Sequence, residues 1–229
     1  MKTETLNLET SRGNTTAHVA RPDADAAAAV LLIHEWWGIN DHIHDIAGRF
    51  ANEGFLCIAP DLFRGKVATN TDAASKLMNE LPIEDGIETI NEAISKAKIA
   101  YQTQKFGIIG FCMGGTFALR AACEIEELAA AAPFYGDIPP EDVLQNLKAQ
   151  TLFIAGSRDS WINAEKLNAL KDAAKKFELP VEVKVYDADH AFFNNTRPAV
   201  YDADASADAW RRVLDLFRKQ LAIAVPTGA

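Results

Sequence analysis

Short runs of apolar residues alternate along this chain with longer segments in which apolar residues recur every three or four positions. An unbroken apolar run is typical of a strand covered on both faces, and the longer spacing is typical of an amphipathic helix. The predicted strands are residues 28–33, 55–59, 106–109, 128–135, 151–155 and 181–185. The predicted helices cover residues 41–53, 71–80, 83–97, 116–122, 141–147, 164–177 and 203–221.

This order of strands and helices predicts an α/β fold, with a mostly parallel sheet and helices on both faces. Residues 1–25 do not follow this order of strands and helices. Two alternating segments, residues 3–8 and 15–20, flank a Gly13-Asn14 turn and predict a hairpin at the sheet edge. Residues 225–229 are expected to fray. Without a repeat or a linker, residues 1–229 are interpreted as a single domain.

The composition narrows the class of protein. The chain is 48% hydrophobic and 24% charged, with a formal net charge of −9, so it offers no basic face to nucleic acid or an anionic membrane. No stretch approaches the roughly 20 apolar residues of a membrane span, and the N-terminus opens no apolar signal region. Cys57, Cys112 and Cys123 fit no disulfide or metal framework. These features predict a cytoplasmic protein in a reducing compartment.

One glycine-rich segment, Gly110-Phe-Cys112-Met-Gly114-Gly115, joins a predicted strand to a predicted helix. A strand, a sharp turn and a helix with a nucleophile at the apex form the nucleophile elbow of α/β-hydrolases. Gly110 and Gly114 leave room for strand and helix to cross closely. The positive end of the following helix favours the thiolate of Cys112. The alternative is a structural cysteine in a glycine-rich turn.

A cysteine nucleophile needs a base, because a thiol with an ordinary pKa of about 8.5 is largely protonated at pH 7. His190 follows the last predicted strand, and Asp159 follows the strand before it. Both fall at the carboxyl ends of the strands, where chemistry collects in a parallel sheet. The order Cys112, Asp159, His190 is the nucleophile, acid and base order of this fold. Asp137 is the rival acid.

Acyl transfer also needs amide donors for the oxyanion. The backbone N–H of Met113, directly after the nucleophile, is the first candidate, and that of Trp36, in the loop after residue 33, is the second. Glu35 stands beside this second donor. A carboxylate near the thiol discourages thiolate formation by like-charge repulsion. A surface acid and a loop-holding acid are the other two interpretations of Glu35.

Two histidine-containing segments resemble metal-binding motifs. His34-Glu35-Trp-Trp-Gly38 begins like the zinc-protease HExxH but lacks the second histidine. In Asp41-His-Ile-His44-Asp45 the two histidines are two positions apart and face different sides of a helix. No metal site is predicted, and the second segment is expected to be a helix cap and a solvated face.

Four segments together resemble the dienelactone hydrolase (carboxymethylenebutenolidase) family. They are Ile33-His-Glu35-Trp-Trp-Gly38, Ala59-Pro60-Asp61-Leu62, the elbow itself and Asp189-His190-Ala-Phe-Phe, and the likeness runs from about residue 15 to 220. The resemblance implies an α/β-hydrolase fold, a Cys112–His190–Asp159 triad, oxyanion donors at Trp36 and Met113, and no cofactor. It also implies that Glu35 pairs with the resting thiol.

The chain departs from this family in its substrate-binding arginines. The position four residues after His190 is Asn194, and no arginine lies between Arg64 and Arg120. Arg197, Arg64 or Lys66 are possible substitutes. A pocket without a positioned cation binds anions poorly, so neutral esters or lactones are the expected substrates.

The sequence therefore predicts a cysteine-dependent hydrolase of small carboxylic esters or lactones. The residues expected to line an apolar pocket are Trp36, Trp37, Tyr135, Trp161 and Phe192, and Arg197 is a further candidate substrate-binding residue. The expected partner is a small-molecule substrate. A monomer is the default, and a dimer is the alternative. A non-catalytic binding or sensor protein that retains the fold is the alternative function.

Overall fold

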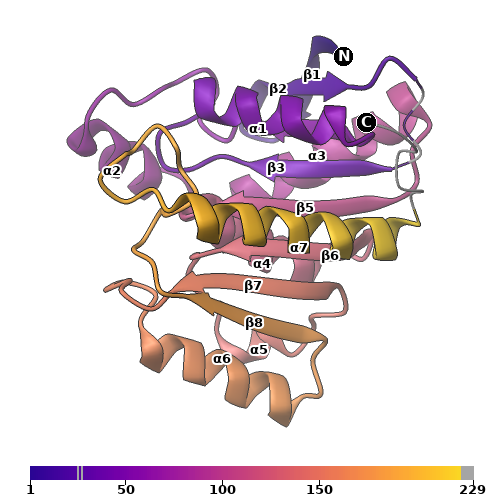
Figure 1. Ribbon diagram of the computed structural model, residues 1–229. Helices are drawn as coiled ribbons and strands as arrows, with labels where there is room; N and C mark the ends of the chain where they lie inside the picture. Colours follow the sequence, from indigo (N-terminus) through magenta and orange to yellow (C-terminus); the bar gives the residue numbers. More distant parts are fainter. Residues whose placement is uncertain (25, 27, 223–229) are drawn as a thin grey trace.

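Eight strands form one sheet in the computed structural model, which describes residues 1–24, 26 and 28–222 (Figure 1). The spatial order is β1-β2-β4-β3-β5-β6-β7-β8. The strands are β1 (Lys2–Thr10), β2 (Gly13–Arg21), β3 (Ala29–Ile33), β4 (Leu56–Pro60), β5 (Phe106–Phe111), β6 (Leu128–Phe134), β7 (Gln150–Gly156) and β8 (Val181–Tyr186). The tail predicted to fray, 225–229, lies outside the described residues.

The sheet is parallel except at one edge. Strands β4, β3, β5, β6, β7 and β8 run in parallel, whereas β2 pairs antiparallel with both β1 and β4. The predicted hairpin of β1 and β2 is present, but its turn is Ser11-Arg12 rather than Gly13-Asn14, which pair with Thr10 and Glu9 as the first residues of β2. Gly13 has a φ of +110°, which lies in the region that favours glycine. The predicted mostly parallel α/β sheet is confirmed.

Helices cover both faces of this sheet. They are α1 (Asp41–Asn52), α2 (Thr71–Asn79), α3 (Ile83–Tyr101), α4 (Met113–Glu124), α5 (Glu141–Leu144), α6 (Ala164–Lys176) and α7 (Ala203–Leu221). In Figure 1, α1 and α7 lie in front of the sheet, and α3 and α4 lie behind it. Helix α4 packs directly on β5 and β6, so the helix that follows the elbow sits over the middle of the sheet.

Local sequence explains where several helices begin. The side chains of Asn40, Asn70, Asn163 and Asp202 each accept a hydrogen bond from the backbone N–H three residues ahead. Such a cap satisfies one of the free amides of the first helical turn. These caps fix the chain direction on leaving the strands and loops that precede the helices.

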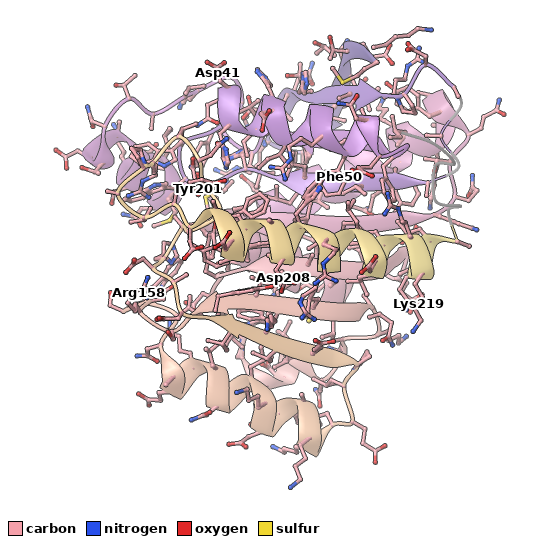
Figure 2. The ribbon with its side chains drawn as sticks, viewed as in Figure 1. Asp41, Phe50, Arg158, Tyr201, Asp208 and Lys219 are labelled. Carbon is pink, nitrogen blue, oxygen red and sulfur yellow. The ribbon has the colours of Figure 1, made fainter. Side chains whose placement is uncertain are left out.

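Aromatic side chains join the two helices on the front face. Phe50 of α1 lies between α1 and α7 (Figure 2), with its ring centroid 4.5 Å from that of Trp210 and 5.9 Å from that of Phe55. The guanidinium of Arg49 lies 4.2 Å from the centroid of Trp210. Strands β3 and β4 are buried along their whole length. Within the described residues, no helix combines the length and the apolar character that crossing a membrane requires.

The tight packing between α3 and α4 can be tested at Gly86. A Cβ at Gly86 would lie 2.1 Å from a ring carbon of buried Phe117, so Gly86→Ala should lower the free energy of unfolding by about 1–3 kcal/mol. Gly48 of α1 is the matched control. Its added Cβ would lie 3.5 Å from the sulfur of Met1, so Gly48→Ala should be neutral or stabilise by about 0.5–1 kcal/mol. Urea denaturation measures both, and equal effects would contradict the packing argument.

Candidate active site

Cys112 occupies a strained turn between β5 and α4. Its φ is 56° and its ψ is −118°, a conformation that is costly for any residue with a side chain. Its N–H donates to the Phe134 carbonyl at 3.1 Å, and its carbonyl accepts from the Thr116 N–H at 3.1 Å. The backbone is therefore fixed on both sides of the cysteine, as the elbow interpretation requires.

Two glycines make this turn sterically possible. A Cβ at Gly110 would lie 2.0 Å from the carbonyl oxygen of Gly114, and a Cβ at Gly114 would lie 2.2 Å from that of Ile33. Both contacts are with backbone atoms, which cannot move aside. Glycine at these positions lets α4 cross close to the ends of β3 and β5.

His190 and Asp159 form a hydrogen-bonded pair at the same edge of the sheet. His190 Nδ1 lies 2.6 Å from Asp159 Oδ2, and Asp159 Oδ1 accepts the N–H groups of Trp161 at 2.8 Å and Ile162 at 2.9 Å. Burial opposes ionisation of Asp159, but the His190 contact and these amides outweigh it and lower the pKa of the carboxyl. An ionised Asp159 accepts the Nδ1 proton, which leaves Nε2 of His190 as the proton acceptor.

Asp137, the alternative acid partner for His190, forms an ion pair with another residue. Asp137 Oδ1 lies 2.6 Å from the ammonium of Lys166. The two acids next to His190 in the sequence, Asp187 and Asp189, both pair with Arg158. Of the acids considered, the structure brings only Asp159 to the imidazole.

The thiol of Cys112 is protonated at neutral pH. Burial first, and the negative charge of Glu35 second, raise its pKa to about 12, while the N–H of Met113 acts in the opposite direction. The field of the α4 N-terminus was expected to favour the thiolate. Burial and the neighbouring carboxylate overcome it, because both penalise a second negative charge in a poorly solvated site.

Glu35 is buried in the loop after β3, with 2% of its surface exposed. Its Oε2 accepts a hydrogen bond from Nδ2 of Asn194 at 2.6 Å. Burial raises the pKa of this carboxyl, and the contact with Asn194 and the charges of Arg197 and His190 offset only part of the rise. This rules out a surface acid. The sequence does not predict this contact with Asn194, because the position stands out in the sequence only as one where the family resemblance expects an arginine.

His34 fixes the loop that carries Glu35 and Trp36. Its Nδ1–H donates to the Glu35 carbonyl at 2.6 Å, and its Nε2 accepts from the Leu62 N–H at 3.1 Å. Complete burial lowers the pKa of His34. This neutral tautomer leaves no ring nitrogen for a metal, in agreement with the rejected HExxH motif. The N–H of Trp36, the predicted second oxyanion donor, has no hydrogen-bond partner within the described part of the chain. It is therefore available to a ligand.

Aromatic rings surround the His190 imidazole. Its ring centroid lies 4.9 Å from that of Tyr135 and 5.5 Å from that of Trp161, which is 37% exposed. Trp36 and Trp37 pack edge to face, with centroids 5.2 Å apart, and are partly exposed. Tyr135 and Phe192 are fully buried, so their place in the pocket wall stays a prediction.

The two histidines of the second metal-like segment have separate neighbours. His42 is buried against Phe111 and its Nδ1 lies 3.3 Å from Asn195 Oδ1, so the expected solvated face is wrong for this residue. His44 is exposed and packs on His18 of β2, with centroids 4.4 Å apart. Helix packing from α1 onto the His190 loop buries His42, and the local sequence does not show this.

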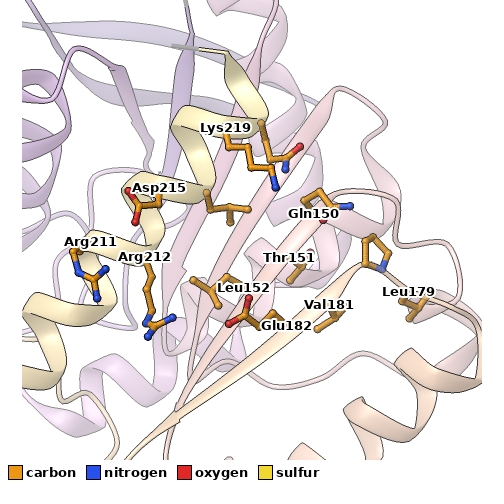
Figure 3. A pocket seen from close by; sticks show the side chains of 13 residues that line it. Gln150, Thr151, Leu152, Leu179, Val181, Glu182, Arg211, Arg212, Asp215 and Lys219 are labelled. Carbon is orange, nitrogen blue, oxygen red and sulfur yellow. The ribbon is translucent and has the colours of Figure 1, made fainter. Parts of the chain in front are cut away.

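A surface hollow elsewhere in the molecule contains none of the candidate site residues. It has a volume of about 560 Å³ and lies between α7 and the amino ends of β7 and β8 (Figure 3). Arg211, Lys219 and Gln150 line it, and none of the triad residues does. The candidate residues Cys112, Asp159 and His190 lie instead at the carboxyl ends of the strands.

Comparison with known proteins identifies the family of this chain. The model of the dienelactone hydrolase family matches residues 15–221, nearly the whole chain. The chain belongs to the dienelactone hydrolase family. It is therefore a hydrolase that acts on esters or lactones, and its partner is a small-molecule substrate of that class.

Individual relatives of this dienelactone hydrolase family member cover most of the chain. It is 36% identical over 206 residues to "Protein usf" of Aquifex pyrophilus, covering 84% of this chain and 88% of that protein. It is 34% identical over 209 residues to the "Putative carboxymethylenebutenolidase" of Aquifex aeolicus, covering 86% and 90%. The crystal structure of a "Putative Dienelactone Hydrolase" from Klebsiella pneumoniae superposes with a TM-score of 0.88 at 25% identity, covering 97% and 99%.

The neutral state of His34 predicts a pH dependence of stability. The unfolded chain protonates His34 near its ordinary pKa of about 6.5, whereas burial lowers the pKa in the folded protein. The unfolded state then binds more protons, so stability present above pH 6.5 is lost as the pH falls toward the folded pKa. In His34→Gln, the slope of unfolding free energy between pH 6.5 and 5.5 should decrease by up to about 1.4 kcal/mol per pH unit.

Urea denaturation of wild type and His34→Gln at several pH values measures this slope. Glu35, His18 and His42 also have shifted pKa values, but they contribute equally to the slope in wild type and in the variant. Identical slopes in wild type and His34→Gln would show that His34 is not held neutral.

Proposed function

We propose that this member of the dienelactone hydrolase family hydrolyses small carboxylic esters or lactones through Cys112, His190 and Asp159. The observation that carries the proposal is the 2.6 Å pair of His190 Nδ1 and Asp159 Oδ2 at the strand edge where Cys112 stands in its strained turn. A histidine oriented by a buried carboxylate is the usual partner of an activated nucleophile.

Acylation begins with loss of the thiol proton. His190 Nε2 accepts it, or the Glu35 carboxylate accepts it first, and the Cys112 sulfur forms a bond to the carbonyl carbon. The carbonyl oxygen becomes negative and is held by the N–H groups of Met113 and Trp36. The carbon–oxygen bond of the ester or lactone then breaks, and the departing oxygen takes the proton back. A thioester to Cys112 remains.

Deacylation reverses the roles. His190 removes a proton from water, and the resulting hydroxide attacks the thioester carbonyl. The same two amides hold the negative oxygen, and the carbon–sulfur bond breaks. The sulfur regains the proton from His190, and the carboxylic acid leaves. Every proton and electron pair in the cycle comes from the substrate, water and these side chains.

The protonated thiol constrains this mechanism. With a pKa of about 12, the thiolate at pH 7 amounts to about one part in 10⁵. A preformed thiolate therefore contributes little, and proton transfer to a nearby base has to accompany substrate binding. The same protonation state is the observation that favours the alternative function, a non-catalytic binding or sensor protein with an inert cysteine.

Substrate charge is proposed from the residues around the thiol. Arg64 is held by the hairpin, where it donates to the Gly13 carbonyl and the Thr10 hydroxyl, so it is a poor substitute cation. Arg197 forms no side-chain hydrogen bond or ion pair within the described residues, and its charge reaches Glu35 and Cys112. Glu35 and Asp159 contribute carboxyl groups rather than cations to the site, so neutral esters and lactones remain the favoured substrates.

The triad assignment predicts the activity of three variants. Cys112→Ala and His190→Ala should each lower kcat/KM for a small aryl ester by at least about 10⁴-fold, because they remove the nucleophile and the base. Asp159→Asn should cost roughly tenfold to hundredfold less, because Asp159 only orients the base. Cys123→Ala is the matched control and should retain full activity. Equal activity in wild type and Cys112→Ala would exclude Cys112 as the nucleophile, whereas a wild type that does not hydrolyse the ester would favour the non-catalytic binding or sensor protein.

Substrate charge predicts a second comparison. A neutral lactone should be hydrolysed with a higher kcat/KM than a matched anionic one, because no arginine fork is positioned for a carboxylate. The same pair is measured with Arg197→Ala. A strong anion preference that disappears in Arg197→Ala would contradict the prediction and would show that Arg197 provides the carboxylate site.

A further inference from the structure

The side chain of Asn194 is hydrogen-bonded at both ends of its amide. It lies in the loop after β8, and 1% of the residue is exposed. Its Oδ1 accepts from the Thr196 N–H at 3.0 Å and from the Thr196 hydroxyl at 2.7 Å, and its Nδ2 donates to Glu35 Oε2 at 2.6 Å. Because a backbone N–H can only donate, Thr196 fixes which end of the amide faces Glu35.

This contact is the one side-chain hydrogen bond that Glu35 makes within the described residues. No cation forms an ion pair with it there. A neutral amide stabilises a buried carboxylate less than an arginine fork does. The other charged or titratable groups that act on Glu35 or respond to it are Arg197, His190, Cys112 and Tyr135. A small change in the amide contact should therefore change the charge that Glu35 carries.

We propose that Asn194 is a positioning residue for the thiol: held by Thr196, its amide fixes the Glu35 side chain in the loop that follows Ile33 and His34, whose carbonyls lie against Gly114 of the cysteine turn, and so controls the charge that Glu35 presents to Cys112. The proposal rests on the proposed role of Cys112 as the nucleophile. It assigns a function to the position where the family resemblance expects a substrate-binding arginine. In this chain the residue acts on Glu35 rather than directly on the substrate.

Two substitutions should act in different ways. Asn194→Leu removes the donor, so the buried Glu35 more readily takes the proton of Cys112 and the thiolate becomes more populated. Asn194→Asp keeps an oxygen for Thr196 but puts a second carboxyl beside Glu35. The two carboxyls then share one proton and retain a negative charge, so the thiolate is not favoured. A mere loosening of the loop would hydrate the thiol and favour the thiolate in both variants.

The test is the rate at which iodoacetamide alkylates Cys112 between pH 7 and 9, followed by mass spectrometry of the peptide that contains Cys112. The variants are Asn194→Leu, Asn194→Asp, Glu35→Gln and the double variant Glu35→Gln/Asn194→Leu. Thr196→Val is the matched control, because it removes one donor to Asn194 and leaves the contact with Glu35. Asn194→Ala replaces Asn194→Leu if the latter does not fold, since it removes the same donor without bulk.

Asn194→Leu should react about tenfold faster than wild type at pH 8, equivalent to about one pKa unit. Asn194→Asp should react no faster than wild type, and Thr196→Val should change the rate less than twofold. In the Glu35→Gln background, Asn194→Leu should have no further effect. An unchanged rate in Asn194→Leu, equal acceleration in Asn194→Asp, or acceleration that persists in the double variant would each overturn the proposal. Alkylation requires no turnover, so the result is independent of the ester hydrolysis assays.

Discussion

The close crossing of β5 and α4 is the constraint on which the site depends. With backbone oxygens 2.0 and 2.2 Å from where a Cβ would stand, Gly110 and Gly114 accept no side chain. That crossing forces Cys112 to a φ of 56° and presents it at the strand ends. Such a backbone costs about 1–3 kcal/mol, which the fully buried strands β3 and β5 offset by holding the turn in place.

The second feature that organises the site is its low solvation. Burial lifts the pKa of Cys112 and of Glu35 in the same direction, because each loses the water that would stabilise its anion. The pKa of Asp159 is lowered despite its burial, because two backbone N–H groups and His190 replace the lost water. In the proposed mechanism, the resting site therefore holds a carboxylate that orients the base and a thiol whose proton has to be moved during the reaction. Reactivity then depends on which neighbour takes that proton.

Periodicity and chain order account for most of the predicted fold. The apolar runs match β3 to β8, and the helical spacing matches α1 to α7 within a few residues. The pairing of Asp159 with His190 was also predictable, since both follow parallel strands and so meet at one edge. Chain order favoured Asp159, but it left Asp137 as a rival that follows a strand in the same way. Lys166 and Arg158 decide against the other acids through contacts that bridge 29 to 31 positions.

Interactions between distant side chains were not predictable. Glu35 and Asn194 are 159 positions apart, and neither residue type demands the other. His34 holds the loop that carries Glu35 in place because its ring also accepts a hydrogen bond from the N–H of Leu62. No local sequence pattern predicts that contact. The thiol pKa likewise results from burial and a neighbouring carboxylate outweighing a helix end.

The most direct measurement of the central claim is to trap the acyl-enzyme. Wild type is mixed with a slowly deacylating aryl ester, quenched in acid, digested and analysed by mass spectrometry. The account predicts the mass of the acyl group on the peptide that contains Cys112. Turnover with no acyl group on Cys112, or with the acyl group on another residue, would contradict it.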